Sequence, residues 1–91
     1  MIPPGEAEDW LNSNSLNALI NGDSQEVLQQ LPDESIDCVM TSPPYWGVRD
    51  YDGDSGLGLE NDVDDFIDNL LDIIEEVQRV LKPRGSFWLN I

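Results

Sequence analysis

Apolar residues recur at helical spacing between Asp62 and Lys82, and this pattern restricts the fold more than any other feature of the chain. The recurring residues are Val63, Phe66, Ile67, Leu70, Ile74, Val77 and Leu81. Asp62 or Asn61 can cap the start of such a helix, and Arg79 with Lys82 in its last turn suits the helix dipole. The pattern predicts a long amphipathic helix whose apolar stripe faces a core.

Short apolar runs bounded by turn residues lie on both sides of that helix. We expect strands over Leu16–Ile20, Ile36–Met40 and Ser86–Ile91. A shorter helix should begin at Asp23, cover residues 24–31 and end at Pro32. The order strand, helix, strand, helix, strand predicts an α/β fold of three parallel strands with right-handed crossover helices.

The first 15 residues differ in character from the rest. Pro3, Pro4 and Gly5 oppose regular structure, so we expect residues 1–15 to form an irregular lead-in anchored by Trp10. Residues 16–91 then form one folded unit, because 91 residues allow at most one small domain.

The chain is strongly acidic. Four basic residues stand against 19 acidic ones, which gives a formal net charge of -15, the opposite of a nucleic-acid-binding footprint. A hydrophobic content of 40% still supports a folded core. Such a surface resembles those of haloarchaeal proteins, and in molar salt a Debye length of about 3 Å would screen repulsion from DNA phosphates. An acidic domain that does not bind DNA explains the charge equally simply.

The residue inventory excludes several kinds of site. The single Cys38 rules out an internal disulfide, and its expected role is that of a small buried apolar side chain. The absence of histidine excludes a Cys/His metal site, and we expect no metal. No apolar run reaches membrane-spanning length, and no signal peptide is evident at Met1, so a cytoplasmic location is expected.

The run Ser42-Pro43-Pro44-Tyr45 follows the second predicted strand and carries the clearest chemistry. Two prolines stiffen the chain, so the Ser42 hydroxyl and the Pro43 carbonyl are presented at a fixed spacing. These acceptors suit an amino group on an aromatic base, whose nitrogen lone pair is delocalised into the ring. Two hydrogen bonds accepted from its N–H groups can make that nitrogen more tetrahedral and turn its lone pair towards a methyl donor.

Aromatic residues beside these acceptors suit a base removed from its duplex. Tyr45 can stack on an extruded base, and stacking of roughly 1 to 3 kcal/mol is comparable with the cost of unstacking. Trp46 either widens that stacking platform or packs on the edge of the sheet.

Several segments in a fixed order resemble the amino-terminal part of amino-directed DNA methyltransferases of the permuted type. They are Asn21-Gly22-Asp23, residues 31–37, Thr41–Tyr51, Gly58-Leu59-Glu60 and Arg79–Gly85. The resemblance implies part of a Rossmann-like fold that uses S-adenosylmethionine and double-stranded DNA with a flipped base. It also implies a place in a restriction-modification system.

The same resemblance assigns roles to individual residues. Ser42, Pro43, Pro44 and Tyr45 correspond to the catalytic loop, and Gly22 with Asp23 to a contact with the adenine end of the cofactor. The alternative role for Asp23 is helix capping alone. Tyr45, Trp46 and Arg49 correspond to contacts with the base or DNA. The alternative for Arg49 is a solvated charge on the loop. Serine at the first motif position is typical of enzymes that act on cytosine N4 rather than adenine N6.

The family's glycine-rich cofactor loop, of the Phe-x-Gly-x-Gly kind, does not occur in the 91 residues, and neither does a target-recognition region. We therefore expect residues 16–91 to be a partial catalytic domain that needs a carboxyl-terminal methyltransferase portion and is inactive alone. The alternative, from another functional class, is a non-catalytic acidic domain that binds a partner or mimics DNA.

Overall fold

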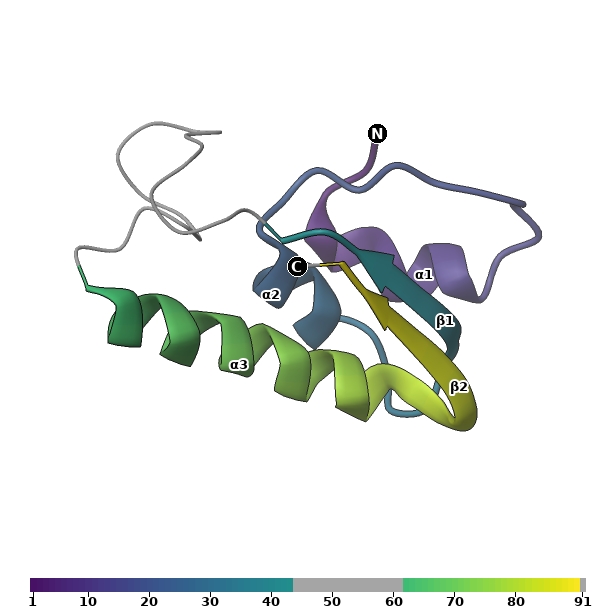
Figure 1. The fold of residues 1–91 in the computed structure, drawn as a ribbon. Coiled ribbons are helices and arrows are strands. Elements are labelled where there is room, and N and C mark those ends of the chain that lie inside the picture. The colour runs from purple at the N-terminus through teal and green to yellow at the C-terminus, as the bar shows by residue number, and fades with distance from the viewer. Residues whose placement is uncertain (44–61, 91) are drawn as a thin grey trace.

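A computed structural model gives the fold and describes residues 1–43 and 62–90. In chain order its elements are η1 (Pro4–Glu6), α1 (Ala7–Leu11), α2 (Ser24–Gln29), β1 (Ile36–Thr41), α3 (Val63–Val80) and β2 (Leu81–Leu89). The two strands pair in parallel, α3 runs alongside them, and α2 packs against α3 (Figure 1). The predicted α/β class is confirmed.

Helix α3 forms where the apolar pattern predicted it, but the predicted stripe faces the core only in part, because Val63 and Ile67 are 44% and 45% exposed. Asp62 is its N-cap, and the carboxylate Oδ1 of Asp62 accepts a hydrogen bond from the Asp64 backbone N–H at 2.8 Å. Val77 and Val80, near the end of the helix, are 3% and 0% exposed and belong to the core. The helix ends at Val80 because Pro83 disfavours helical backbone at the preceding residue and has no N–H for a further helical bond.

Strand β2 begins at Leu81, directly after α3, rather than at the predicted Ser86. Its pairing with β1 is irregular between Ile36 and Cys38. At this irregularity a Cβ on Gly85 would lie 3.1 Å from the carbonyl oxygen of Asp37 and 2.9 Å from a methyl carbon of Leu81. The missing side chain of Gly85 therefore lets the two strands approach closely where their register changes.

The segment Leu16–Ile20 does not form the predicted strand. Ile20 makes one isolated parallel bridge, to Ile2, supported by backbone bonds from Ile2 N to Leu19 O at 2.8 Å and from Asn21 N to Ile2 O at 3.0 Å. Leu16 is 97% exposed. A strand needs a partner along its length, and only Ile2 lies beside this segment, so residues 1–43 and 62–90 contain two strands where the sequence predicted three.

The lead-in is more ordered than its composition indicates. Pro4 occupies the first turn of η1, where a missing N–H costs nothing, and α1 continues directly from it. Ala7 at the start of α1 is fully buried. Residues predicted to be irregular therefore contribute to the core.

The predicted burial of Cys38 is wrong. Successive strand residues point to opposite faces, which places Cys38 and Met40 of β1 beside Ser86 and Trp88 of β2 on one face. Cys38 is exposed, Met40 is 77% exposed and Trp88 is 61% exposed. No element of the described part of the chain covers this face.

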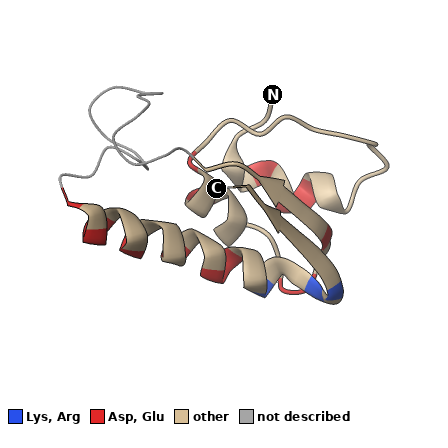
Figure 2. Ribbon diagram, viewed as in Figure 1, with Lys and Arg blue, Asp and Glu red and all other residues tan. Residues whose placement is uncertain are grey.

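Charge is unevenly distributed over the fold. Figure 2 shows acidic residues along α3 and basic residues gathered where α3 meets β2. Those basic residues are Arg79, Lys82 and Arg84. In the described ranges no helix has the length and apolar character needed to cross a membrane.

Candidate functional site

The candidate catalytic loop begins at the carboxyl end of β1. Thr41 is the last residue of the strand, Ser42 follows it and is exposed, and Pro43 is half-buried. The other predicted site residues of this loop, Pro44, Tyr45, Trp46 and Arg49, lie outside the described residues. The structure therefore positions the first half of the motif.

Asn90 lies beside Ser42, and it is a residue that the sequence did not single out. Its backbone N–H donates to the Thr41 carbonyl at 3.0 Å, which extends the pairing of β2 with β1 by one residue. Its side-chain Nδ2 donates to the Ser42 hydroxyl oxygen at 3.3 Å. The detectable signal was a polar residue near the carboxyl end of the predicted strand Ser86–Ile91, since the carboxyl ends of neighbouring parallel strands meet at one edge of a sheet.

Gly22 and Asp23 precede α2. In Figure 1 the start of α2 lies at the same end of the molecule as the carboxyl ends of β1 and β2. Asp23 is the N-cap residue, as predicted, but its exposed carboxylate makes no capping hydrogen bond. The carboxylate is thus not used by the helix start.

Gly22 has a packing role that needs no cofactor. A Cβ at this position would lie 2.6 Å from Cγ of Pro4 and 3.2 Å from Cγ2 of Val27. The lead-in therefore packs directly against the Gly22 backbone. This contact accounts for glycine at the position.

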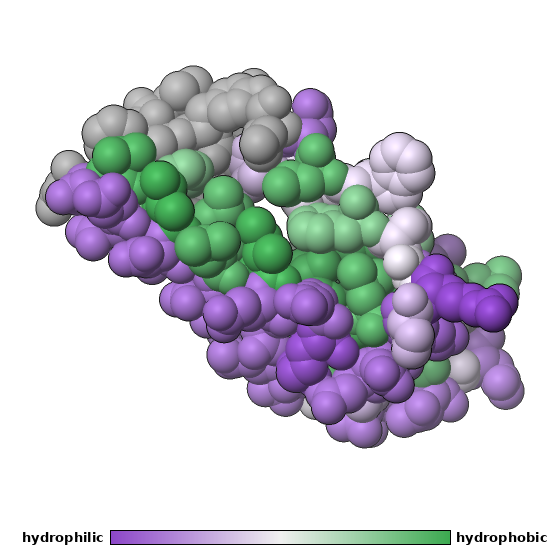
Figure 3. Space-filling view, turned by 60° about the horizontal axis from the view of Figure 1, so that its bottom comes forward, coloured by the Kyte–Doolittle hydropathy of each residue, from purple (hydrophilic) through white to green (hydrophobic). Residues whose placement is uncertain are grey.

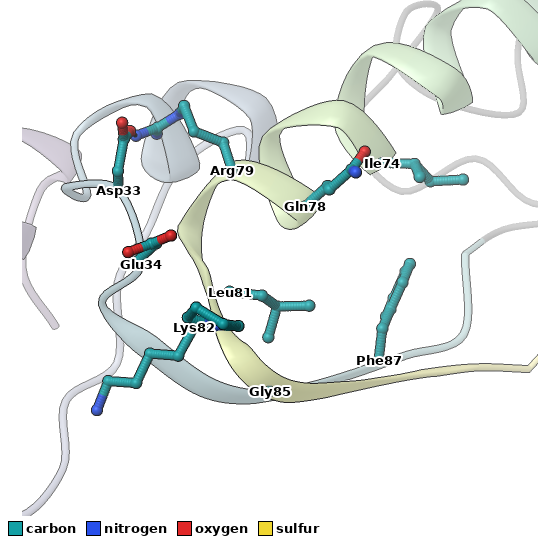
Figure 4. Close-up of a pocket in the computed structure, with 10 residues that line it drawn as sticks. Asp33, Glu34, Ile74, Gln78, Arg79, Leu81, Lys82, Gly85 and Phe87 are labelled. Atoms are coloured by element: carbon teal, nitrogen blue, oxygen red, sulfur yellow. Dashed lines mark hydrogen bonds and ion pairs between the residues drawn. The ribbon is translucent and has the colours of Figure 1, made fainter.

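A hollow of about 920 Å³ lies at the other end of the strands, where α3 joins β2. Apolar walls come from Ile74, Leu81 and Phe87, and Asp33 with Glu34 lie at its rim (Figure 4). Ligands of open parallel sheets bind at the carboxyl ends of the strands, but this hollow adjoins the amino end of β2. It is therefore separate from the Ser42 loop.

Arg79 ties the loop before β1 to the end of α3. Its guanidinium donates to Asp33 Oδ1 at 2.6 Å, to Glu76 Oε2 at 2.9 Å and to the Leu28 carbonyl at 2.7 Å. The hydrogen bonds to Asp33 and then Glu76 raise the pKa of Arg79 above its ordinary value. The resulting network fixes where β1 begins relative to α3.

Backbone contacts reinforce this junction. The N–H groups of Glu34 and Ser35 donate to the carbonyls of Arg79 and Val80 at 3.0 and 2.8 Å. Glu34 has a φ of 52°, an uncommon conformation for a residue with a side chain. Two of the segments that carried the sequence resemblance, residues 31–37 and Arg79–Gly85, are thus in direct contact.

The acidic residues do not assemble into a metal centre among residues 1–43 and 62–90. No group of three or more Asp, Glu or Cys side chains there has a geometry that could hold an ion.

Comparison with known families gives this site its context. Residues 36–91 match the family described as DNA methylase, N6_N4_Mtase. The chain belongs to this DNA methylase family. The match begins at β1 and so includes Ser42, Asn90 and all of α3 and β2.

The chain is also similar to several type II methyltransferases. It is 60% identical over 95 residues to M.SfiI of Streptomyces fimbriatus. The aligned region covers 97% of this chain and 23% of that enzyme. It is 45% identical over 87 residues to M.SmaI of Serratia marcescens. Here the aligned region covers 94% of this chain and 30% of that enzyme. The chain therefore spans less than a third of these two relatives. No solved structure matches the chain.

Proposed function

We propose that this chain is the catalytic segment of a type II DNA methyltransferase that methylates the exocyclic amino group of a flipped base. The observation that carries the proposal is the position of Ser42 at the carboxyl end of β1, with Asn90 at 3.3 Å, inside a chain of the DNA methylase family. The enzyme then accompanies a restriction endonuclease. A haloarchaeal source and the permuted motif order are parts of the same proposal.

Ser42 and Pro43 hold the amino group of the base. The Ser42 hydroxyl oxygen and the Pro43 carbonyl accept its two N–H bonds, and Pro44 keeps the loop stiff. The amino lone pair then forms the new N–C bond as the bond between sulfur and the methyl carbon breaks, and the bonding pair stays on sulfur. The extra N–H proton leaves to water. Tyr45, with Trp46, stacks on the extruded base, and Arg49 pairs with a phosphate.

S-adenosylmethionine supplies the electrophilic methyl group when it is bound. Asp23 and the backbone of Gly22 fit its adenosine end, because the Asp23 carboxylate is exposed and unused by the helix start that it caps. The 91 residues contain no Phe-x-Gly-x-Gly segment to hold the methionine end. We infer that a carboxyl-terminal methyltransferase portion supplies that segment and target recognition, and that residues 16–20 pair as a third strand in the assembled Rossmann-like sheet.

Cytosine N4 is the favoured target. A neutral serine hydroxyl accepts a hydrogen bond less strongly than a carboxylate, so more of the work falls on the main-chain carbonyl. The acidic surface along α3 is compatible with DNA binding if the missing portion carries the phosphate contacts. A non-catalytic acidic domain is the competing function, supported by the net charge of -15.

Reconstitution separates the two functions. The 91-residue chain is mixed with duplex DNA, labelled S-adenosylmethionine and the part of M.SfiI that lies outside the matched 95 residues. We expect no transfer by the chain alone and transfer by the mixture. Ser42→Ala should lower the rate about tenfold to a hundredfold, the range of one transition-state hydrogen bond.

Ser86→Ala is the matched control, because Ser86 is an exposed strand serine whose hydroxyl oxygen accepts a hydrogen bond from Trp88 Nε1. Its rate should equal that of the unaltered chain. No transfer by any mixture, with both polypeptides folded, would favour the non-catalytic domain.

A further inference from the structure

Helix α3 carries a second apolar stripe that is not part of the core. The core stripe is formed by Phe66, Leu70, Ile73, Val77 and Val80, which are buried or half-buried. The second stripe is formed by Val63, Ile67, Leu71 and Ile74, each three or four residues from the next. Its first three members are 44%, 45% and 51% exposed.

This second stripe forms one wall of a groove. Ile74 leads into the hollow at the α3–β2 junction, whose other apolar walls are Leu81 and Phe87. Figure 3 shows an apolar band along α3 and a hollow between it and a second apolar group. An 18-residue helix is about 27 Å long, so the exposed stripe of α3, which ends at this hollow, offers a partner helix a straight apolar surface.

The rim of the groove is acidic. One helical row beyond the stripe, on the side away from the core, lie Asp64, Asp68 and Glu75, all exposed. None of them forms an ion pair with a described residue. The cations nearest the hollow are already engaged, since Arg79 pairs with Asp33 and Glu76 and Lys82 pairs with Asp37 at 3.0 Å.

We propose that this groove seats an amphipathic helix with a basic flank, supplied by the remaining portion of the methyltransferase. Its apolar face covers Ile67, Leu71 and Phe87, and its Lys or Arg residues pair with Asp64, Asp68 and Glu75. Parallel sheets are covered by layers of helices, so a helix beside α3 is the element that fits the groove. This inference rests on the proposed function, because the proposed function names the remaining portion.

The test measures association rather than catalysis. The full chain is titrated with the part of M.SfiI outside the match, and the dissociation constant is determined by calorimetry. Ile67→Asp and Leu71→Asp should each raise it about tenfold or more. Asn14→Asp, which adds the same charge at an exposed position of the lead-in, outside α3 and residues 16–20, should leave it unchanged. Circular dichroism verifies that each variant is folded.

A second pair of variants tests the acidic rim. Replacing Asp64, Asp68 and Glu75 together by Lys should weaken association and reverse its salt dependence, because salt would then screen a repulsion in place of an attraction. Replacing Asp65 and Asp72, on the far side of the same helix, by Lys should do neither.

Failure of this inference is distinct from failure of the proposed function. Absence of association, association indifferent to Ile67 and Leu71, or a chain that instead dimerises through these residues would each overturn the inference. Methyl transfer that survives Leu71→Asp would support the proposed function but contradict helix docking in the groove. A complex that is weakened by Leu71→Asp yet transfers no methyl group would support helix docking in the groove but contradict the proposed function.

Discussion

The side-chain nitrogen of Asn90 lies 3.3 Å from the hydroxyl oxygen of Ser42, although 48 residues separate them in sequence. The two residues meet because β1 and β2 are parallel and end at the same edge. The Nδ2–H of Asn90 donates to one lone pair of the Ser42 hydroxyl oxygen and leaves the other lone pair to accept from the amino group of the substrate. Asn90 is thus suited to orient the proposed catalytic hydroxyl.

Asn90→Ala should therefore lower kcat of the reconstituted enzyme about tenfold, the value of roughly one hydrogen bond, and leave the KM for S-adenosylmethionine unchanged. Steady-state kinetics with labelled cofactor measure both constants. Asn14→Ala, at an exposed position outside the helices and strands and outside residues 16–20, serves as the control. An equal loss of kcat in both variants would contradict the role of Asn90.

Arg79→Ala should destabilise the fold, because it removes the hydrogen bonds of α3 to Asp33 in the loop before β1 and to the Leu28 carbonyl in α2, as well as the bond to Glu76 within α3. We expect a loss of about 1 to 2 kcal/mol in the free energy of unfolding, since Asp33 is largely exposed and its ion pair contributes little. Urea denaturation measures the loss. Arg84→Ala removes an exposed arginine outside this network and should change the free energy by much less.

The contribution of Arg79 has a defined pH dependence. Its folded-state pKa is raised, so the stabilisation is fully present below the unfolded-state value and is lost only as pH rises through the folded-state value, in strongly alkaline solution. The difference in unfolding free energy between Arg79→Ala and the unaltered chain should therefore be constant between about pH 7 and pH 10. A steady decline across that interval would mean that another group carries the effect.

Gly22→Ala tests whether glycine at this position serves packing. The new methyl group would meet Cγ of Pro4 at 2.6 Å, so we expect a loss of about 1 to 3 kcal/mol in thermal or urea unfolding. Gly5→Ala, where nothing lies within 4 Å, should be nearly neutral. Adding Pro4→Ala to Gly22→Ala should restore part of the loss. Without such recovery, the clash with Pro4 is not the cause.

The features that could be predicted from the sequence are those set by local pattern. The apolar spacing of α3, its cap at Asp62 and the α/β order follow from helix and strand periodicity. The missed features depend on what lies beside each segment. The stretch from Leu16 to Ile20 has strand character but, among the described residues, forms a single bridge, to Ile2. Cys38 is apolar but lies on a face that no described element covers.

In the candidate site, too, local pattern predicted some residues and the pairing of distant segments determined the others. Ser42 was identified because stiff prolines directly follow it, whereas Asn90 becomes part of the site only through the pairing of two strands. Arg79 was assigned to the helix dipole, but its main contacts reach Asp33, 46 residues away, and the Leu28 carbonyl. Contacts of this kind depend on the register and packing of whole elements, which no local pattern specifies.

The most direct measurement identifies the methylated base. DNA from the reconstituted reaction is digested to nucleosides, and the labelled product is identified by mass spectrometry. We predict that the labelled product is N4-methylcytosine and that its amount falls about tenfold or more with Ser42→Ala. A label on a ring carbon of the base, or a label unaffected by Ser42→Ala, would contradict the assignment of this chain to amino-group methylation through Ser42.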